Sequence, residues 1–435
     1  MRKIKFLVVA LVVMFGFMFT ARAAEVAPER TTVGGKDYFF ANGVAITIEE
    51  PTTAGMGALI KWDGGSEEVP ATITVFGGRH NSTEVHNANV VMNGGTVKNI
   101  FGGGLHRSSL NEVNITVNGG TITGAIMGGG YEELVNCGDG DFNIVTEEDV
   151  LDSTTRVEKV NIVINDGHVG SVYGGGGAHA YTGTVSIVIN KTQNEIAYVI
   201  GGGSNGHTGS ADVVINGGKV AVLQGVNRGT MNSVEMEITG GEVENAYVVG
   251  EPDPSVTGTI EEGKIEITGG AVENLAPGTN GVEEGQAVSA KDEIVVKYNK
   301  DAVANVDETE FNEDALTKTV TLTFVVDGEE YALEHEVGTP FTEEEVEELI
   351  EEINEITKEN NKEVEDFFGD ADYNAIFDML EDLNEGKTIY VQLKEVAEEG
   401  TKNPETSDIG LVGVIFTLLL SVAGLGYTIK RRKFN

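Results

Sequence analysis

A recurring set of histidine, arginine and tyrosine residues follows glycine-rich turns along this chain. These residues are Arg79, His80, His106, Arg107, Tyr131, His179, Tyr181, His207 and Arg228. If the turns stack along one edge of the fold, the set forms a stripe. Its aromatic groups, with the amides of Asn205 and Asn227 at two of the turns, could meet the ring faces and hydroxyls of a glycan. The alternative is that they are ordinary polar loops, and their variable offset from the glycines favours that alternative.

Metal binding has one candidate. Asp139-Gly140-Asp141-Phe142-Asn143 resembles the start of a calcium loop, with Asp139, Asp141 and Asn143 as the oxygen ligands of a Ca²⁺ ion. The segment has Ile144 and Val150 where the EF-hand pattern needs Gly and Glu, so a solvated acidic loop is the stronger interpretation. The histidines are too unevenly spaced for the fixed geometry of a metal site.

Catalysis would need paired carboxylates or a base facing one groove. Glu237, Glu244, Glu266 and Glu273 recur, but at positions typical of an exposed strand face, and no catalytic set emerges. A polysaccharide-acting lyase or hydrolase remains an alternative by analogy with other β-helices, and analogy of fold does not supply a site. Cys137 is the single cysteine, so no disulfide forms within the chain.

The elements that position these residues repeat. Asn93-Gly94-Gly95 and its copies place the corresponding asparagine or threonine at positions 93, 118, 165, 190, 216, 239 and 268. The steps are 25, 47, 25, 26, 23 and 29 residues, and the second holds the long acidic insertion between Tyr131 and Glu158. Each copy has short β-branched runs bounded by Gly and Asn, which indicate strands and turns.

Strands this short must stack to bury a face, and a period of about 25 residues suits one turn of a parallel β-solenoid. We expect two internal ladders of stacked side chains. The first is Met92, Val117, Ile164, Ile189, Ile215, Ile238 and Ile267, and the second is Phe101, Met127, Tyr173, Ile200 and Val248. The solenoid is expected over residues 24–290 and to be right-handed. Antiparallel hairpins in a sandwich or propeller are the alternative.

Charge excludes one class of partner. The chain has 70 acidic and 29 basic residues, for a formal charge of -41. Nucleic-acid binding needs a basic face, which this composition argues against. A charge of this sign suits a soluble exported protein with a weak attraction for cations.

The first residues indicate export. Arg2, Lys3 and Lys5 precede an apolar run, and Ala21-Arg22-Ala23 offers a cleavage site, so residues 1–23 are expected to be a secretory signal peptide. The chain from Glu25 onward would then form an irregular first rung. Its aromatic run Tyr38-Phe39-Phe40 is expected to cap the open end of the solenoid.

A different composition follows the solenoid. We expect a linker or cap at 291–318, with a last strand over Ile294–Tyr298, and a small α+β domain at 319–395 of order β-β-α-α-β. Thr342 and Glu345 form a capping box for its first helix, whose crowded glutamates suit a solvated face, and its second helix is expected over Ala371–Asn384. Through Thr323–Gly328 and Ile389-Tyr390 the domain resembles the grasp-like repeat modules of bacterial surface proteins.

The C-terminus combines three signals. A tether and motif at 396–408 contain Asn403, Pro404, Glu405, Thr406 and Ser407, an apolar run at 409–429 is long enough to span a bilayer, and a basic tail occupies 430–435. This order resembles the cell-wall sorting signal of Gram-positive surface proteins, with its LPXTG-type motif. Pro404 and Thr406 match that motif, whereas Asn403 and Ser407 replace its Leu and Gly. A plain membrane anchor is the alternative.

The resemblance implies that a sortase cuts after Thr406 and joins the chain to peptidoglycan. We therefore expect a secreted protein on the surface of a Gram-positive bacterium, attached to the wall or the membrane. Its expected role is that of an adhesin or interaction protein, with a glycan or a host or matrix protein as ligand and no cofactor unless Ca²⁺ binds. A polysaccharide-acting enzyme and a purely structural spacer are the alternatives.

Overall fold

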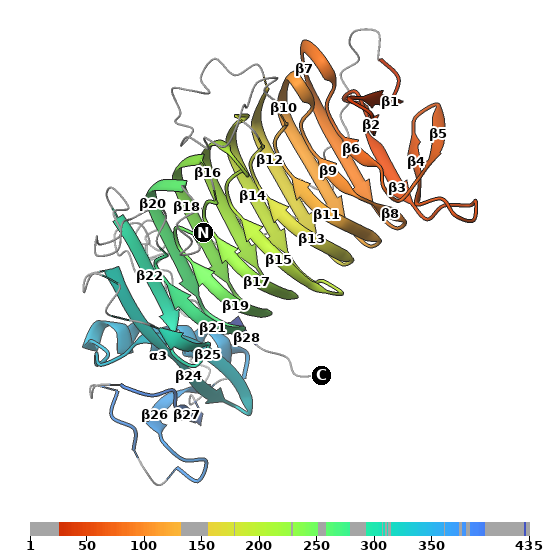
Figure 1. Ribbon diagram of the computed structural model, residues 1–435. Coiled ribbons are helices and arrows are strands. Elements are labelled where there is room, and N and C mark those ends of the chain that lie inside the picture. The colour runs from red at the N-terminus through yellow and green to blue at the C-terminus, as the bar shows by residue number, and fades with distance from the viewer. Residues whose placement is uncertain are drawn as a thin grey trace, which may run out of the picture.

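The computed structural model describes residues 26–131, 155–177, 179–227, 229–250, 258–278, 293–306, 308, 311, 315–360, 362–373, 376–379, 383–395 and 430–431. The described chain is mainly β. Its strands stack in successive turns that form an elongated coil (Figure 1). Two sheets run along it, and each turn of the chain, called a rung below, adds one strand to each sheet.

The short-strand sheet forms one side of the coil. In spatial order its strands are β1 (Glu29–Val33), β2 (Lys36–Phe40), β6 (Thr74–Phe76), β9 (Asn99–Phe101), β11 (Thr121–Met127), β13 (His168–Tyr173), β15 (Glu195–Ile200), β17 (Lys219–Gln224), β19 (Glu242–Tyr247), β21 (Ala271–Ala276) and β23 (Val303–Val306), and β8 (Thr96–Val97) also pairs with β11. From β2 to β23 every neighbouring pair is parallel.

The long-strand sheet forms the other side. Its repeating part is β7 (His80–Met92), β10 (Leu105–Val117), β12 (Arg156–Ile164), β14 (Tyr181–Ile189), β16 (Gly206–Ile215), β18 (Gly229–Ile238), β20 (Gly258–Ile267) and β22 (Glu293–Asn299). These strands are also parallel to one another. Parallel rungs on both sides are the arrangement expected of a β-solenoid, and they exclude antiparallel hairpins as the organisation of the repeats.

The first predicted ladder is confirmed at every position. Val117 is in register with Met92 and Ile164, and the column continues through Ile189, Ile215 and Ile238 to Ile267. All seven side chains are fully buried. Burial of one such aliphatic side chain contributes about 1.5–3 kcal/mol. The column therefore holds consecutive rungs together without a disulfide.

The second predicted ladder is in register but was assigned to the wrong layer. Phe101, Met127, Tyr173 and Ile200 do stack, but Tyr247 occupies the position predicted for Val248. Successive side chains of a strand face opposite ways. The main core therefore takes the preceding residues, Ile100, Ile126, Val172, Val199, Leu223, Ala246 and Leu275. Phe101 packs instead in a separate cluster with Phe40, Phe76 and Leu105, with Met127 against it.

Two kinds of glycine turn join the sheets. In the Asn-Gly-Gly turn the second glycine has a positive φ, as at Gly95 (77°) and Gly120 (89°), which an L side chain rarely adopts. In the triple-glycine turn the constraint is space. A Cβ on Gly128 would lie 2.2 Å from the Gly174 carbonyl oxygen of the next rung. Gly128 N–H donates to Tyr173 O at 2.9 Å across the same gap.

The asparagines that mark the repeat form a hydrogen-bonded ladder. Asn118 donates to Asn93 at 2.9 Å and Asn165 donates to Asn118 at 2.8 Å. Asn190 and Asn216 extend the ladder, which ends on the Thr239 hydroxyl. The step of 47 residues is one rung, because Val117 pairs directly with Ile164, and residues 132–154 lie outside the described part.

The first rung is closed by antiparallel strands. Tyr38, Phe39 and Phe40 lie on β2, and β1 pairs antiparallel along its outer edge. On the other side β3 (Ile46–Glu49) pairs with β7 in parallel, and β4 (Ala58–Trp62) and β5 (Gly65–Val69) continue antiparallel from it. Hairpins therefore cover the sheet edges, and Phe39 is buried in the core rather than acting alone as a cap.

The solenoid continues past residue 290. The expected strand Ile294–Tyr298 is confirmed as part of β22, which pairs with β20, and β23 adds to β21. The first residues of β24 (Leu316–Val326) pair with β22 in parallel. The small α+β module is thus joined to the long-strand sheet by hydrogen bonds.

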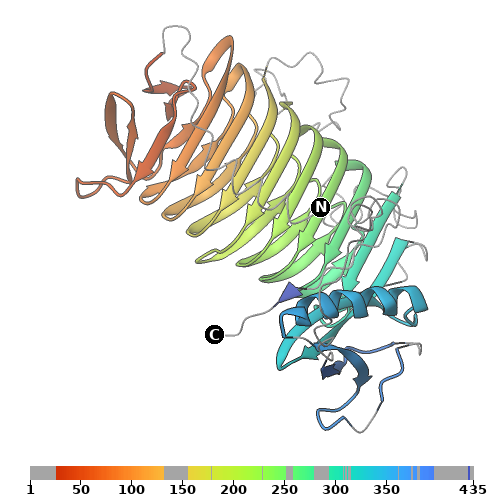
Figure 2. The same cartoon turned by 180° about the vertical axis from the view of Figure 1, so that it is seen from behind.

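The module consists of β24, β25 (Glu329–Glu336), α3 (Glu343–Thr357), a short 3₁₀ turn at Lys358–Asn360, β26 (Lys362–Phe368) and β27 (Thr388–Glu395). The Thr342–Glu345 capping box is confirmed. Helix α3 lies along one face of the strands (Figure 2) and buries Leu349 and Ile353 against them.

The predicted second helix is wrong. The described residues within 371–384 contain no helix, and Ile376 is 71% exposed. A strand missed from the sequence, β26, pairs antiparallel with β27, and the chain after it returns through a bridge between Phe368 and Ile376. Leu383 does reach the core, but from an irregular segment bridged to Thr339.

The described residues include no helix long and apolar enough to cross a membrane. The expected signal peptide and the expected span at 409–429 lie outside those residues. Lys430–Arg431 form β28, which pairs antiparallel with Tyr331 and Ala332 of β25.

Candidate binding surface on the solenoid edge

The predicted stripe residues that the structure describes lie where the triple-glycine turns run into the long strands. Hydrogen bonds between backbones join these turns from rung to rung. Leu105 N–H donates to Arg79 O at 3.0 Å, and His106 N–H donates to Tyr131 O at 3.0 Å. Gly177 continues the series through a bridge to Tyr131. The structure thus places this part of the stripe on one edge, which we call the glycine-turn edge.

The backbone along this edge is strained. Asn81, His106, Arg107 and His179 have φ values of 52°, 50°, 43° and 65°. Non-glycine residues adopt this left-handed region infrequently, and such conformations concentrate at functional sites. Four such residues at equivalent turns mark this edge as a candidate site.

The first cluster of side chains belongs to the N-terminal rungs. The His80 ring stacks on Phe40 with centroids 5.6 Å apart and lies 5.9 Å from the ring of His106. Desolvation by the surrounding protein, followed by the charge of His106, lowers the pKa of His80 from 6.5. His80 is therefore held toward its neutral form, in which one ring nitrogen donates and the other accepts a hydrogen bond.

The second cluster spans four rungs. Arg156, Tyr181, His207 and Thr230 are in register at the starts of β12, β14, β16 and β18. The Arg156 guanidinium lies 3.9 Å from the centre of the Tyr181 ring, a cation–π contact. His207 stacks with Tyr181 at 5.7 Å, and its Nδ1 is 2.9 Å from the Thr230 hydroxyl.

This second cluster determines which atoms face a ligand. Arg156 and His207 come from the rungs on either side of Tyr181, so they occupy the faces of its ring. His207 is only 1% exposed and so supports the phenol from beneath the surface. Tyr181 is half-buried, and the Arg156 side chain is 26% exposed, with its Nε 3.5 Å from the Glu158 carboxylate. The Tyr181 hydroxyl and the Arg156 guanidinium are thus the polar groups of the column nearest the surface. Sequence reasoning missed Arg156 and Thr230, although aligning Arg156 with Tyr181 within the repeat would have found the first.

The remaining stripe residues are dispersed. Arg79 donates to Asn42 O at 3.2 Å and forms an ion pair with Glu84. Its guanidinium therefore links the turn after β6 to the turn after β2. Tyr131 packs edge-on against Phe101 at 5.8 Å. His179 N–H donates to Asn205 O at 2.6 Å, and Arg107 is exposed. Arg228 lies outside the described residues. The single predicted stripe is therefore two clusters with isolated residues between them.

Other predicted sites fall outside the described residues. These are the candidate calcium ligands Asp139, Asp141 and Asn143, the thiol of Cys137, and the sorting motif Asn403, Pro404, Glu405, Thr406 and Ser407. Within the part of the chain that the structure describes, no three His, Cys, Asp or Glu residues are grouped as metal ligands.

The recurring glutamates occupy neighbouring rungs. Glu237 is in register with Glu266, whose carboxylate contacts Lys297 at 3.2 Å and Lys264 at 3.8 Å. Glu244 and Glu273 are exposed on the short-strand sheet. Ion pairing of this kind links rungs and gives Glu266 a structural role.

Comparisons of the chain with protein-family models, with curated proteins and with solved structures found no match. The arguments for function therefore start from the geometry of the two clusters.

Proposed function

We propose that this protein is exported, is attached to the cell surface through its C-terminus, and acts as an adhesin that binds a hydroxyl-rich extracellular ligand, a glycan, along the glycine-turn edge. The observation that carries the proposal is the Arg156–Tyr181–His207–Thr230 column beside the strained turns. It presents a phenol hydroxyl and a guanidinium on a rigid strand platform. Hydrogen-bond donors held in fixed positions favour ligands rich in hydroxyl groups.

The C-terminal sequence supports surface attachment. Cleavage after Thr406, as the sorting-signal resemblance implies, would remove residues 407–435 and with them β28. β25 would keep all eight of its residues paired with β24, so the module would lose no internal pairing. The α+β module would then hold the solenoid away from the attachment point.

Binding at the glycine-turn edge is tested with conservative variants. Tyr181→Phe removes only the hydroxyl, and Arg156→Gln removes the charge. We expect each to weaken adhesion of cells, and glycan retention by the isolated protein, by about 5- to 20-fold, as for one hydrogen bond to a charged or polar group. Lys191→Gln, an exposed change at the Asn-Gly-Gly turns, is the matched control. Equal binding by all three variants and the native chain would remove this edge as the site.

The same assay separates the enzyme alternative from the adhesin. A polysaccharide that is retained and recovered intact supports an adhesin, whereas release of shortened products supports a hydrolase or lyase. A spacer without a ligand would retain none of the polysaccharides.

Attachment is tested by mass spectrometry of protein released from cells by wall-degrading enzymes. A C-terminal peptide ending at Thr406 with a cross-bridge fragment attached is the expected result. An intact peptide through Asn435 in the membrane fraction would refute sortase anchoring.

A further inference from the structure

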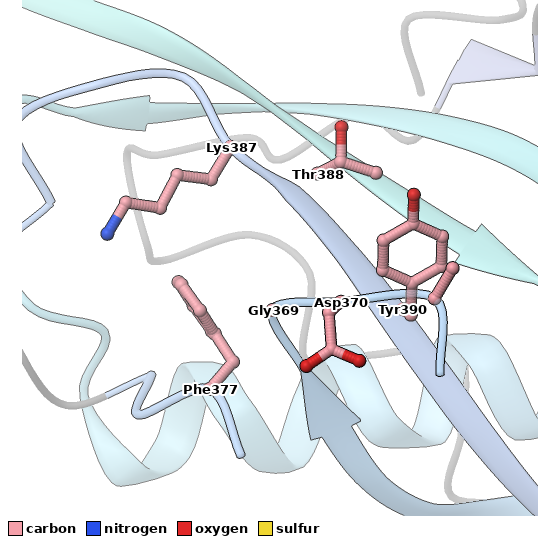
Figure 3. Close-up of a pocket in the computed structure, with 7 residues that line it drawn as sticks. Gly369, Asp370, Phe377, Lys387, Thr388 and Tyr390 are labelled. Atoms are coloured by element: carbon pink, nitrogen blue, oxygen red, sulfur yellow. The ribbon is translucent and has the colours of Figure 1, made fainter. Parts of the chain in front are cut away.

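The module that follows the solenoid has a groove that neither the repeat nor the proposed adhesive edge uses. Ile389 and Val391 of β27 are buried, and alternation along the strand turns Thr388 and Tyr390 to the other face. There, a groove of about 570 Å³ lies among Thr388, Tyr390, the loop Gly369–Ala371, Phe377 and Lys387 (Figure 3). This volume is within the range of small-molecule sites.

Hydrogen bonds fix the walls of the groove. Phe377 N–H donates to Phe367 O at 2.9 Å, which anchors its segment to the end of β26. The Asp370 carboxylate accepts from Asp372 N–H at 3.0 Å and so shapes its own turn. Tyr373 packs edge-on against Phe368 at 5.4 Å. The groove is thus held open by contacts within the module.

The lining combines one apolar surface with groups of opposite charge. The Lys387 ammonium lies 5.4 Å from the centre of the Phe377 ring. In Figure 3, Phe377 lies between the Lys387 ammonium and the Asp370 carboxylate, with the Thr388 and Tyr390 hydroxyls across the groove. Lysine and aspartate charges cancel here, so the groove is locally neutral although the chain carries a formal charge of -41.

We propose that this groove is a second binding site, which takes a neutral sugar unit. A sugar offers an apolar C–H face to Phe377 and hydroxyl groups that both donate and accept, which matches an ammonium, a carboxylate and two hydroxyls. Anions are disfavoured by the formal charge of -41 on the chain. A zwitterion would rely on two ion pairs in an open groove, where such pairs contribute little. The α+β module, proposed above to hold the solenoid away from its attachment point, is thereby also a binding module.

The test uses the full chain, purified in a detergent without a sugar headgroup. Saturation-transfer NMR with glucose, galactose, mannose and N-acetylglucosamine reports contact, and calorimetry with the best of these measures affinity. We expect transfer to at least one sugar and none to glycine, a zwitterion of similar polarity. Phe377→Ala and Lys387→Gln should each weaken that affinity at least 5-fold.

Ile376→Ala is the matched control, because Ile376 adjoins Phe377 but does not line the groove. Lys387 is exposed, so its variant is expected to fold even if Phe377→Ala does not. Absence of transfer to every sugar, binding of glycine alone, or equal affinity in the Lys387 and Ile376 variants would overturn the proposal. The edge variants Tyr181→Phe and Arg156→Gln should leave this signal intact, so failure of one site leaves the other open to test.

Discussion

The triple-glycine turns should tolerate no side chain, and Gly128→Ala tests this. A Cβ at Gly128 would lie 2.2 Å from Gly174 O and 2.3 Å from Val160 Cγ1. The first atom is backbone of the next rung and the second is part of the core, so neither can rotate away. The two rungs must therefore separate locally.

The cost follows from the contacts that separation breaks. Overpacking costs about 1–3 kcal/mol. Two hydrogen bonds are at risk, Gly128 N–H to Tyr173 O at 2.9 Å and Gly129 N–H to Gly175 O at 3.2 Å, each contributing about 0.5–1.5 kcal/mol. Alanine recovers about 0.4–1 kcal/mol by restricting the unfolded chain. The net loss in the free energy of unfolding is expected to be about 1–5.6 kcal/mol.

Native-state hydrogen exchange measures this loss where it occurs, since solenoids open locally. Amides of residues 126–130 and 172–176 should lose protection. Gly119→Ala is the control in the same rung, because its Cβ would be 3.0 Å from a single carbonyl oxygen, that of Asn93. Its effect should be below about 1 kcal/mol. Equal protection in the two variants would refute the argument that glycine is required there for close approach of the rungs.

Three further predictions concern the same rungs. Asn165→Ala removes the donor to Asn118 and the acceptor for Asn190, both at 2.8 Å. It should lower the free energy of unfolding, measured by heat or urea, by about 1–2 kcal/mol. The loss should exceed that of Asn93→Ala, the same change at the end of the ladder. Ile164→Ala should cost about 2–5 kcal/mol by leaving a cavity in the core ladder, which urea unfolding would detect, and Ile164→Val should cost no more than about 1.5 kcal/mol. Because the pKa of His80 is lowered below 6.5, the unfolded chain binds a proton more readily between the two values, so stability should fall as pH drops through that window. His80→Gln should reduce this slope in melting temperatures recorded from pH 7.5 to 5, and an unchanged slope would contradict the assignment.

Much of the solenoid was predictable because each rung repeats the same local sequence pattern of strands and glycine turns. The marker asparagines gave the register, and counting back one residue from each marker identified the inner ladder at Met92 through Ile267 correctly. Which face of the short strands points into the main core was not predictable in this way. Strand side chains alternate, so an error of one residue moves Phe101 and Tyr173 from the core to another layer, and their apolar character is equally compatible with either.

The module after the solenoid was harder to predict because it has no repeat. Leu380 and Leu383 have the spacing of a helix, yet Leu383 reaches the core from an irregular segment. The preceding residues Lys362–Phe368 pair with β27, and this long-range pairing outweighed local helix propensity. The groove at Phe377 and Lys387 depends on that pairing, so no local sequence pattern could predict it.

The glycine-turn edge was only partly predictable, and its physical origin explains why. Sequence shows which residues follow each glycine turn, but contact between them requires that neighbouring rungs align to the residue. Arg156, Tyr181 and His207 meet because each is at the start of its long strand, at the in-register distance of about 4.8 Å between strands. The glycines allow that spacing by keeping the turns free of side chains. The stack that holds the fold and the column proposed to bind a ligand therefore depend on the same turns, and loosening Gly128 or Gly174 should disturb both.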